Sequence, residues 1–240
     1  MGRAFEVRKA SMAKTAAAKT KVYSRYGKEI YMAAKAGVPD PEMNTGLKRI
    51  IDEARTKQVP ADVINRAIEK AKGGSEENYH AVTYEGFGPG SASFIVECLT
   101  DNDNRTYSEV RNCFTKSKGK IGVNGSVVHG YDHVGLLSFK HNDEEAIMEI
   151  LLEHEVDLQD IELEEDSITV TVDPTSLHKA KEAIEEALGE TTFDVLEITY
   201  LPHEYVTMSE EDMPNYEKMI KMLDEVEDVQ NYYHNVESGE

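Results

Sequence analysis

The segment between positions 86 and 133 holds the residues whose types and spacing most resemble a ligand-binding motif. The run GFGPG at 86–90 is glycine-rich, as phosphate-binding loops are. No Lys-Ser/Thr pair follows it, and the next segment has the pattern of a strand, so no helix N-terminus would face an anion. A tight turn between two strands is the better interpretation. His129 and His133 lie four apart in a strand-to-loop region, where that spacing does not converge on a metal.

The sequence TDNDNRT, from Thr100 to Thr106, resembles half of a calcium-binding loop. Such a loop started at Asp101 would need Gly at its sixth position and Glu at its twelfth, but Thr106 and Asn112 stand there. Two interpretations remain open: a strand-to-helix connection with an Asn or Asp cap, or a functional polar surface. The candidate residues of that surface are Asn102, Asn104, Arg105 and Thr106.

No set of residues has the pattern of a catalytic or metal centre. Cys98 and Cys113 lack the spacing of metal ligands, and Cys98 lies in an apolar strand pattern, so we expect a buried, inert thiol. The acidic runs are interpreted as solvated faces that repel nucleic acid. We therefore predict no catalytic residue, no metal, no cofactor and no enzymatic activity. No run of 18 apolar residues predicts a membrane span.

Charge is distributed unevenly along the 240 residues. Residues 1–72 contain 16 Lys+Arg and 8 Asp+Glu, whereas residues 73–240 contain 10 and 38. The asymmetry predicts one region that meets a polyanion and another that does not. Within the first 35 residues only Glu6 and Glu29 oppose the cations. These cations are Arg3, Arg8, Lys9, Lys14, Lys19, Lys21, Arg25, Lys28 and Lys35.

The basic region has a helical pattern. Residues 8–19 are Ala-rich without an apolar stripe, which predicts a frayed helix or a disordered arm. Apolar residues at helical spacing then predict three amphipathic helices, at 20–36, 45–58 and 60–72. Tyr23 and Tyr26 fall on the inner face of the first, so we expect them in the core of a small bundle.

Alternation with a period of two begins after position 75. The first segment predicts two strands, a helix and a third strand, at 80–86, 92–99, 104–116 and 126–131. Residues 134–201 then have the order βαββαβ, a ferredoxin-like unit. Its elements are expected at 134–140, 144–154, 158–163, 167–172, 174–188 and 193–201. The tail predicts a strand, a helix and a strand, at 205–208, 209–226 and 229–236.

Neither the tail nor the 80–131 segment can bury a sheet alone, so the two are expected to pair. The predicted fold class is α+β, with a basic helical domain and arm at 1–78, a discontinuous α/β domain at 79–133 and 204–240, and an inserted ferredoxin-like α/β domain at 134–203. Loop tips tolerate such insertions.

Several of these segments resemble the YebC family. The chain contains YEGFGPG from Tyr84, the run LTDNDNRTYSEVRNCFTK, and the closing GKIGVNGSV, in the order that the family shows. The upstream EMNTGLKRIIDEARTKQVPADVINRAIEKAKGG is similar to its helical region. The N-terminus lacks the common M-A-G-H-S-K-W start and is closer to the YeeN-like branch. The chain therefore lacks the Trp of that start.

The resemblance implies three domains, one of them discontinuous, and a non-enzymatic cytosolic protein. Family members are described as probable DNA-binding transcriptional regulators, and others, including a mitochondrial relative, as translation activators at the ribosome. The basic start resembles a transit peptide, but a match that begins near residue 1 assigns it to the mature protein.

We therefore expect a cytoplasmic, monomeric, nucleic-acid-binding regulator of gene expression. The predicted phosphate contacts are Arg3, Arg8, Lys9, Lys14, Lys19, Lys21, Arg25, Lys28, Lys48, Arg49 and Arg55. The polyanion is DNA or rRNA; an acidic body with a basic arm favours the ribosome, where rRNA and basic proteins lie together. The acidic domains would face away or meet a basic protein partner. The alternative is a protein–protein adaptor that uses its ferredoxin-like domains without contacting nucleic acid.

Overall fold

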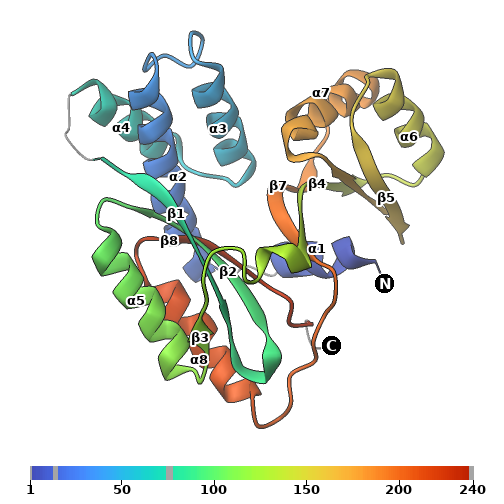
Figure 1. Cartoon of the computed structure of the whole chain (residues 1–240). Helices are drawn as coiled ribbons and strands as arrows, with labels where there is room; N and C mark the ends of the chain where they lie inside the picture. The colour runs from blue at the N-terminus through green and yellow to red at the C-terminus, as the bar shows by residue number, and fades with distance from the viewer. Residues whose placement is uncertain (1, 13–15, 74–77, 238–240) are drawn as a thin grey trace. The chain divides into compact units, whose positions relative to one another are not determined.

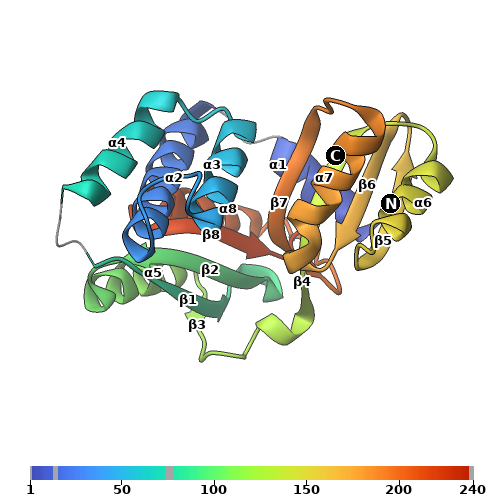
Figure 2. The same cartoon turned by 90° about the horizontal axis from the view of Figure 1, so that it is seen from above.

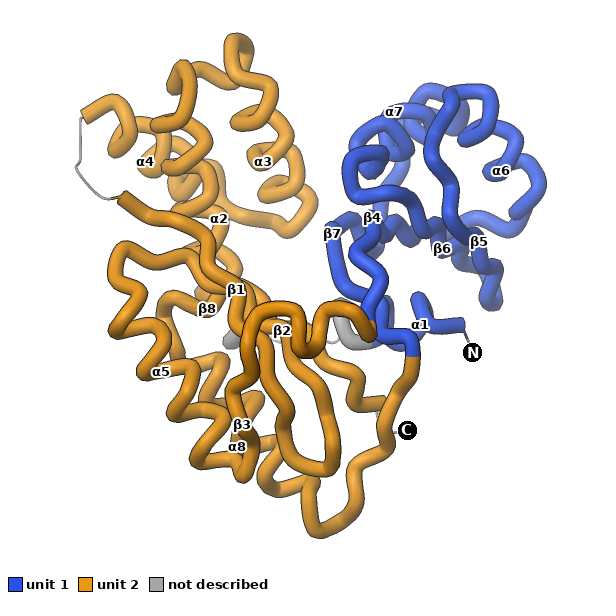
Figure 3. Tube along the Cα trace, in the orientation of Figure 1, with its two compact units in different colours: residues 1–14, 131–203, 240 blue, residues 15–130, 204–239 orange. Residues whose placement is uncertain are grey.

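The chain forms two compact units in a computed structural model that describes residues 2–12, 16–73 and 78–237 (Figure 1). The first unit combines helix α1 (Arg3–Met12) with residues Tyr131–His203, and the second combines the helices and strands between α2 and Gly130 with the segment after Glu204 (Figure 3). This grouping places the predicted helical domain with the discontinuous α/β segments, and α1 with the inserted segment. The division into three domains stays a prediction.

The first unit is a ferredoxin-like fold, as predicted. Its four strands form an antiparallel sheet in the order β5-β6-β4-β7. Two helices in the connections between strands pack on one face of the sheet (Figure 2). The strands are β4 (Tyr131–Lys140), β5 (Leu158–Glu164), β6 (Ser167–Val172) and β7 (Phe193–Pro202). The helices are α6 (Glu144–Glu153) and α7 (Leu177–Leu188), and a 3-10 turn, η3 (Pro174–Ser176), precedes α7.

Successive side chains along each strand point to opposite faces of this sheet, and both faces carry apolar residues that are covered by helices. One face packs against α6 and α7 through residues such as Leu137, Ile147 and Ile184, all fully buried. On the other face, Ala4 of α1 joins a second cluster, and Val7 packs against that cluster. Its strand residues are Val134, Leu136, Val195 and Leu201. The start of the chain is thus a docked helix, because a βαββαβ sheet has its helices on one side only and the remaining apolar face needs a cover.

The basic helices of the second unit form a small bundle. They are α2 (Ala16–Ala36), α3 (Thr45–Thr56) and α4 (Ala61–Lys72). Asn44 caps α3, since its side-chain oxygen accepts a hydrogen bond from the Leu47 N–H at 3.0 Å. Ile30, Leu47 and Ile51 are buried in the shared core. Tyr26 is buried and Tyr23 packs beside it, which confirms their predicted place on the inner face of α2.

The second unit also contains a four-stranded sheet in the order β3-β1-β2-β8. The strands are β1 (His80–Phe87), β2 (Ser93–Thr100), β3 (Lys120–Ile121) and β8 (Val229–His234). The helices α5 (Asp103–Lys116) and α8 (Met213–Glu225) pack side by side (Figure 1). Strand β8, from the tail, pairs antiparallel with β2. Gly86 and Phe87 end β1, and residues 88–92 form the turn to β2, which includes the 3-10 turn η1 (Pro89–Ser91).

Two sequence predictions in this unit are wrong. The strand expected at 126–131 is replaced by β3 at Lys120–Ile121, and residues Val128–Gly130 form a 3-10 turn, η2. The strand expected at 205–208 is reduced to one parallel bridge between Val206 and Val236. The first difference has a physical cause, because the backbone N–H groups after position 122 bind a side chain and so are withdrawn from a strand ladder.

That side chain is Glu85, which is only 6% exposed. One carboxylate oxygen accepts from the Gly125 N–H at 2.6 Å, and the other accepts from the N–H groups of Val127 and Val128 at 2.6 and 2.8 Å. Burial alone would raise the pKa of Glu85, but these three hydrogen bonds hold the pKa below its ordinary value. The carboxylate therefore fastens the 122–130 loop to β1.

We predict that Glu85→Gln lowers the free energy of unfolding by roughly 2–3 kcal/mol at pH 7, because an amide donor replaces an acceptor opposite three N–H groups. Since the pKa of Glu85 is lowered by folding, the stabilisation is present above the pKa of the unfolded carboxyl and is lost as the pH falls through the lower folded pKa. Urea denaturation at pH 7 and at acid pH measures both effects.

Glu109→Gln, on an exposed position of α5, is the control and is expected to change stability little. Amide hydrogen exchange gives an independent measurement. Unchanged protection of the Gly125, Val127 and Val128 amides in Glu85→Gln would contradict the anchoring role.

Candidate nucleic-acid interface

The α3 helix presents three of the predicted phosphate contacts to solvent. Lys48, Arg49 and Arg55 are all exposed. Arg49 pairs with Glu53 at 3.7 Å and Arg55 with Asp52 at 3.3 Å, one turn away on the same helix. Lys48 forms no ion pair with any residue that the structure describes. Exposed pairs of this kind are weak and open at little cost, so all three cations can reach a phosphate.

The cations of α2 have a different environment. The Lys21 ammonium donates a hydrogen bond to the Leu223 carbonyl, at the C-terminal end of α8, at 2.7 Å. Burial lowers the pKa of Lys21. Arg25 pairs with Glu29 at 2.8 Å. The Lys28 ammonium lies 3.4 Å from a carboxylate oxygen of Asp228. Lys21 and Lys28 therefore hold α2 against other segments of its unit, whereas the Arg25–Glu29 pair lies within α2 itself.

Two cations of the N-terminal arm bind acceptors within the fold. In the first unit, Arg3 pairs with Asp132 at 2.8 Å. Arg8 is largely buried, 3.3 Å from the Thr169 hydroxyl and 3.7 Å from the Glu164 carboxylate. Lys9 is exposed. Of the other predicted contacts, Lys14 lies outside the described residues, as does the side chain of Lys19.

Asp228 is the centre of a polar cluster in the second unit. Its side chain is almost fully buried, and its Oδ2 accepts from Arg105 Nη2 at 2.6 Å and from the Thr106 hydroxyl at 2.8 Å. The Thr100 hydroxyl lies 3.3 Å from the same oxygen, and Lys28 approaches Oδ1. Burial would raise the pKa of Asp228, but Arg105, Thr106 and Lys28 together lower it.

This cluster shows where the TDNDNRT segment lies. Asn102 is the N-cap of α5 and accepts from the Arg105 N–H at 3.1 Å, which is the capped connection considered above. Thr106 is fully buried. Asn104 and half of the Arg105 side chain remain at the surface. A second contact surface formed by these residues stays a prediction, and most of their polar atoms bind within the fold.

Sequence analysis overlooked Asp228 because it lies in an acidic run that was interpreted as solvated. The useful signal was its position, immediately before the apolar start of β8 at Val229. An acid at the edge of a buried strand needs a cation or several hydrogen-bond donors as partners. Arg105, for which the sequence indicated no definite partner, could have been proposed as that cation.

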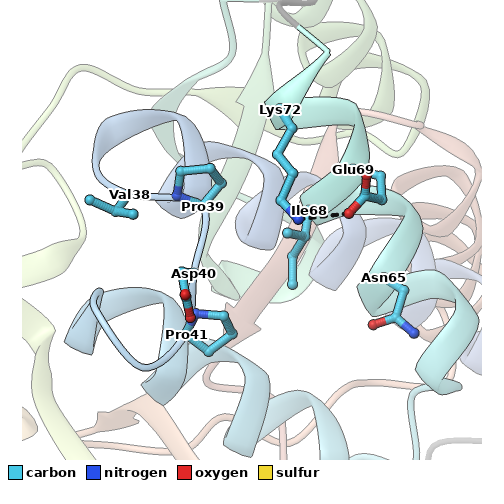
Figure 4. A pocket seen from close by; sticks show the side chains of 8 residues that line it. All are labelled: Val38, Pro39, Asp40, Pro41, Asn65, Ile68, Glu69 and Lys72. Atoms are coloured by element: carbon cyan, nitrogen blue, oxygen red, sulfur yellow. Dashed lines mark hydrogen bonds and ion pairs between the residues drawn. The ribbon is translucent and has the colours of Figure 1, made fainter.

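A surface pocket of about 520 Å³ lies between the α2–α3 connection and α4 (Figure 4). Val38, Pro41 and Ile68 contribute apolar wall, whereas Glu69 and Lys72 bind each other at 2.7 Å. The lining includes no Ser, Cys or His, so it offers no Ser–His or Cys–His pair. With Asp40 the lining has two acids against the single Lys72, so the pocket does not attract a phosphate.

Two further kinds of centre concern metal ligands and cysteine thiols in the described part of the chain. No group of three His, Cys, Asp or Glu side chains there could hold a metal ion. Cys98 and Cys113 are buried, and burial raises the pKa of their thiols to about 12 and about 11. The prediction that Cys98 is buried is confirmed. None of the described helices is both long and apolar enough to span a membrane.

We predict that Asp228→Asn lowers the free energy of unfolding by roughly 2–4 kcal/mol at pH 7. A buried ion pair that loses one partner is costly, although the partial exposure of Arg105 reduces the effect. The pKa of Asp228 is lowered by folding, so its stabilisation is present above the ordinary Asp pKa, near 3.9. The difference between wild type and variant should therefore shrink as the pH falls below about 4.

Asp166→Asn is the control for this experiment, because Asp166 forms an exposed pair with Lys140. It should change stability by less than about 0.5 kcal/mol. Equal losses in the two variants, measured by urea denaturation, would show that the Asp228 cluster is not a special source of stability.

Two family models together match nearly the whole chain. Residues 3–74 match the TACO1/YebC protein N-terminal domain, and residues 79–236 match the TACO1/YebC second and third domain. A protein of Vibrio campbellii named "Probable transcriptional regulatory protein" is 53% identical over 237 residues, which are 99% of this chain and 100% of that protein. A protein of Alteromonas mediterranea with the same description is 51% identical over 235 residues, 98% of each chain.

A solved structure is also similar. The crystal structure of a conserved hypothetical protein from Aquifex aeolicus superposes with a TM-score of 0.76 at 33% sequence identity. The match covers 95% of this chain and 94% of that one. Together with the two domain matches and the near-complete alignments to the curated relatives, this likeness shows that the chain belongs to the TACO1/YebC family.

Proposed function

We propose that this protein is a non-enzymatic regulator of gene expression that binds nucleic acid through its basic N-terminal third. The observation that carries the proposal is the partition of charge, with 16 Lys+Arg against 8 Asp+Glu in residues 1–72 and 10 against 38 in the remainder. The names of the relatives, probable transcriptional regulatory proteins, support the same general role.

Exposure favours α3 as the principal phosphate contact. Lys48, Arg49 and Arg55 are at the surface. Lys21 and Lys28 instead bind acceptors within the fold, the Leu223 carbonyl and the Asp228 carboxylate. Lys9 of the arm is a further exposed candidate. Arg3, Arg8 and Arg25 would have to exchange a carboxylate for a phosphate in order to take part. Phosphate contacts of this type supply affinity with little sequence choice.

Between the two polyanions, we favour rRNA in the cytoplasm over operator DNA. A chain with a net charge of −20 is repelled by a long duplex over most of its surface. A ribosomal site would place rRNA at the basic helices and basic ribosomal proteins at the acidic surface. The protein would then act as a monomeric translation factor, with transcriptional regulation by DNA binding as the second candidate.

We predict that the triple variant Lys48→Gln, Arg49→Gln, Arg55→Gln weakens nucleic-acid binding and reduces its salt dependence. Each phosphate contact on a single strand contributes about 0.7 to the slope of log K against log salt, so loss of three should reduce the slope by about 2. Fluorescence anisotropy with labelled RNA and duplex DNA, titrated with salt, measures the change.

The matched control removes three cations elsewhere, as Lys140→Gln, Lys179→Gln and Lys181→Gln in the first unit. Equal weakening in both triple variants would mean that only net charge matters. Failure of the wild-type chain to bind either nucleic acid at low salt would reject the proposal in favour of the protein–protein adaptor.

Cross-linking in cells, followed by sequencing of the bound nucleic acid, distinguishes the two polyanions. Enrichment of rRNA fragments over promoter DNA supports the translation role, and the reverse result supports transcription. The α3 triple variant serves as the control, since fragments that persist in it do not depend on α3.

A further inference from the structure

The second unit contains a basic segment that the proposed function leaves unused. Residues 110–130 contain four cations and no Asp or Glu, although residues 73–240 as a whole are strongly acidic. The cations are Arg111, Lys116, Lys118 and Lys120. An acid-free stretch of 21 residues in such surroundings creates a local positive potential.

These cations lie at one corner of the second unit. Arg111 and Lys116 are on the C-terminal half of α5, Lys118 is in the following turn, and Lys120 is on the edge strand β3. All four are exposed. Lys218 of α8 adds a fifth, because its ammonium donates to the Lys116 carbonyl at 2.8 Å. We call these five residues the basic corner.

Four cations of the basic corner are unpaired. Arg111, Lys116, Lys118 and Lys120 form no ion pair with any residue described by the structure. The exposed arginines of α3 differ, since each has a carboxylate one turn away. A phosphate bound at the basic corner would therefore displace only water and counterions, and would not have to compete with a carboxylate of this chain.

Two exposed aromatic rings accompany these cations. Phe87 is 45% exposed and Tyr107 is 42% exposed, and they are the two aromatic residues among the large exposed apolar side chains of the described chain. Lys120 is the β-ladder partner of Phe87. Arg111 follows Tyr107 by one turn on α5, so the two side chains share a flank of the helix. Each ring thus lies beside an unpaired cation.

An aromatic face next to a free cation is suited to a base and its phosphate. Bases stack on such rings with little regard to sequence, while the cations follow the backbone. In a duplex the bases are stacked on one another and their faces are not accessible. The Tyr107 ring also contacts Tyr84, with centroids 6.0 Å apart, so the side chain is held in position before any ligand arrives.

We infer that the basic corner, with Phe87 and Tyr107, binds single-stranded nucleic acid. The site rests on the proposed function in that its ligand is a nucleic acid, but it is built from other residues than α3. It gives the protein two contact surfaces within the second unit, one on α3 for phosphates and one at the basic corner for phosphates and unpaired bases. A regulator with both would prefer a strand with unstacked bases over a duplex.

The test uses the full chain and labelled oligouridylate, oligothymidylate and duplex RNA, each of about 20 nucleotides, which exceeds the span of about 4–16 nucleotides of a single-strand site. The variant Lys116→Gln, Lys118→Gln, Lys120→Gln is compared with Lys140→Gln, Lys179→Gln, Lys181→Gln, which has the same net charge. In about 0.1 M salt the first should bind oligouridylate about tenfold more weakly, with a salt slope lower by about 2. The second should change affinity by less than about twofold.

Substitution of the rings tests stacking separately from charge. Phe87→Leu and Tyr107→Leu keep an apolar side chain but remove the aromatic face. Each should weaken single-strand binding by roughly five- to tenfold without changing the salt slope, because no phosphate contact is lost. Thermal unfolding of both variants checks that the fold is retained.

The outcomes separate this inference from the proposed function. If the lysine triple variant binds oligouridylate as wild type does while the α3 variant loses binding, the basic corner is not a site and the proposed function stands. Tighter binding of duplex RNA than of either single strand also overturns the single-strand assignment alone. Equal competition by polyglutamate would show a nonspecific polyanion surface and overturn it. If the wild-type chain binds no nucleic acid, both proposals fall together.

Discussion

The buried carboxylate of Asp228 is the contact on which the second unit depends. It receives Arg105 and Thr106 from the start of α5 and Lys28 from α2, and its own backbone carbonyl accepts from the Leu99 N–H. One side chain thus joins the basic helical bundle, the β2–α5 connection and the tail strand β8. A buried charge is stable only when it is paired and hydrogen-bonded, so these segments must be present together.

The same requirement explains how the basic region is organised. Burying an unpaired cation costs free energy, and the partly buried cations of α2 have acceptors. Lys21 donates to a carbonyl at the end of α8, Arg25 pairs with Glu29, and Lys28 pairs with Asp228. Cations that remain at the surface have weak partners or none. The surface potential that a nucleic acid meets is therefore set by the exposed cations, those of α3 and of the basic corner among them.

The fold class could be predicted from the sequence because apolar residues recur with periods near 3.6 and 2, and these periods define helices and strands without reference to distant partners. The ferredoxin-like order of residues 131–203 was predictable in this way. The helix α1 was not, since Ala4 and Val7 form too short an apolar stripe to indicate burial. Its structure comes from the open face of the β5-β6-β4-β7 sheet. The absence of the strand expected at 126–131 has a similar origin, because the Glu85 carboxylate binds the N–H groups of that loop.

Sequence by itself determined most of the elements, the family resemblance and the partition of charge between the first third and the remainder. Charge and periodicity are local properties, and each residue contributes to them wherever it lies in space. Only the tertiary structure decided which cations are available to a ligand. That property depends on partners far away in the chain, such as Glu164 for Arg8 and Asp228 for Lys28. The affinity for a polyanion depends on these available cations, because a cation paired with a carboxylate must break that pair before it can bind a phosphate.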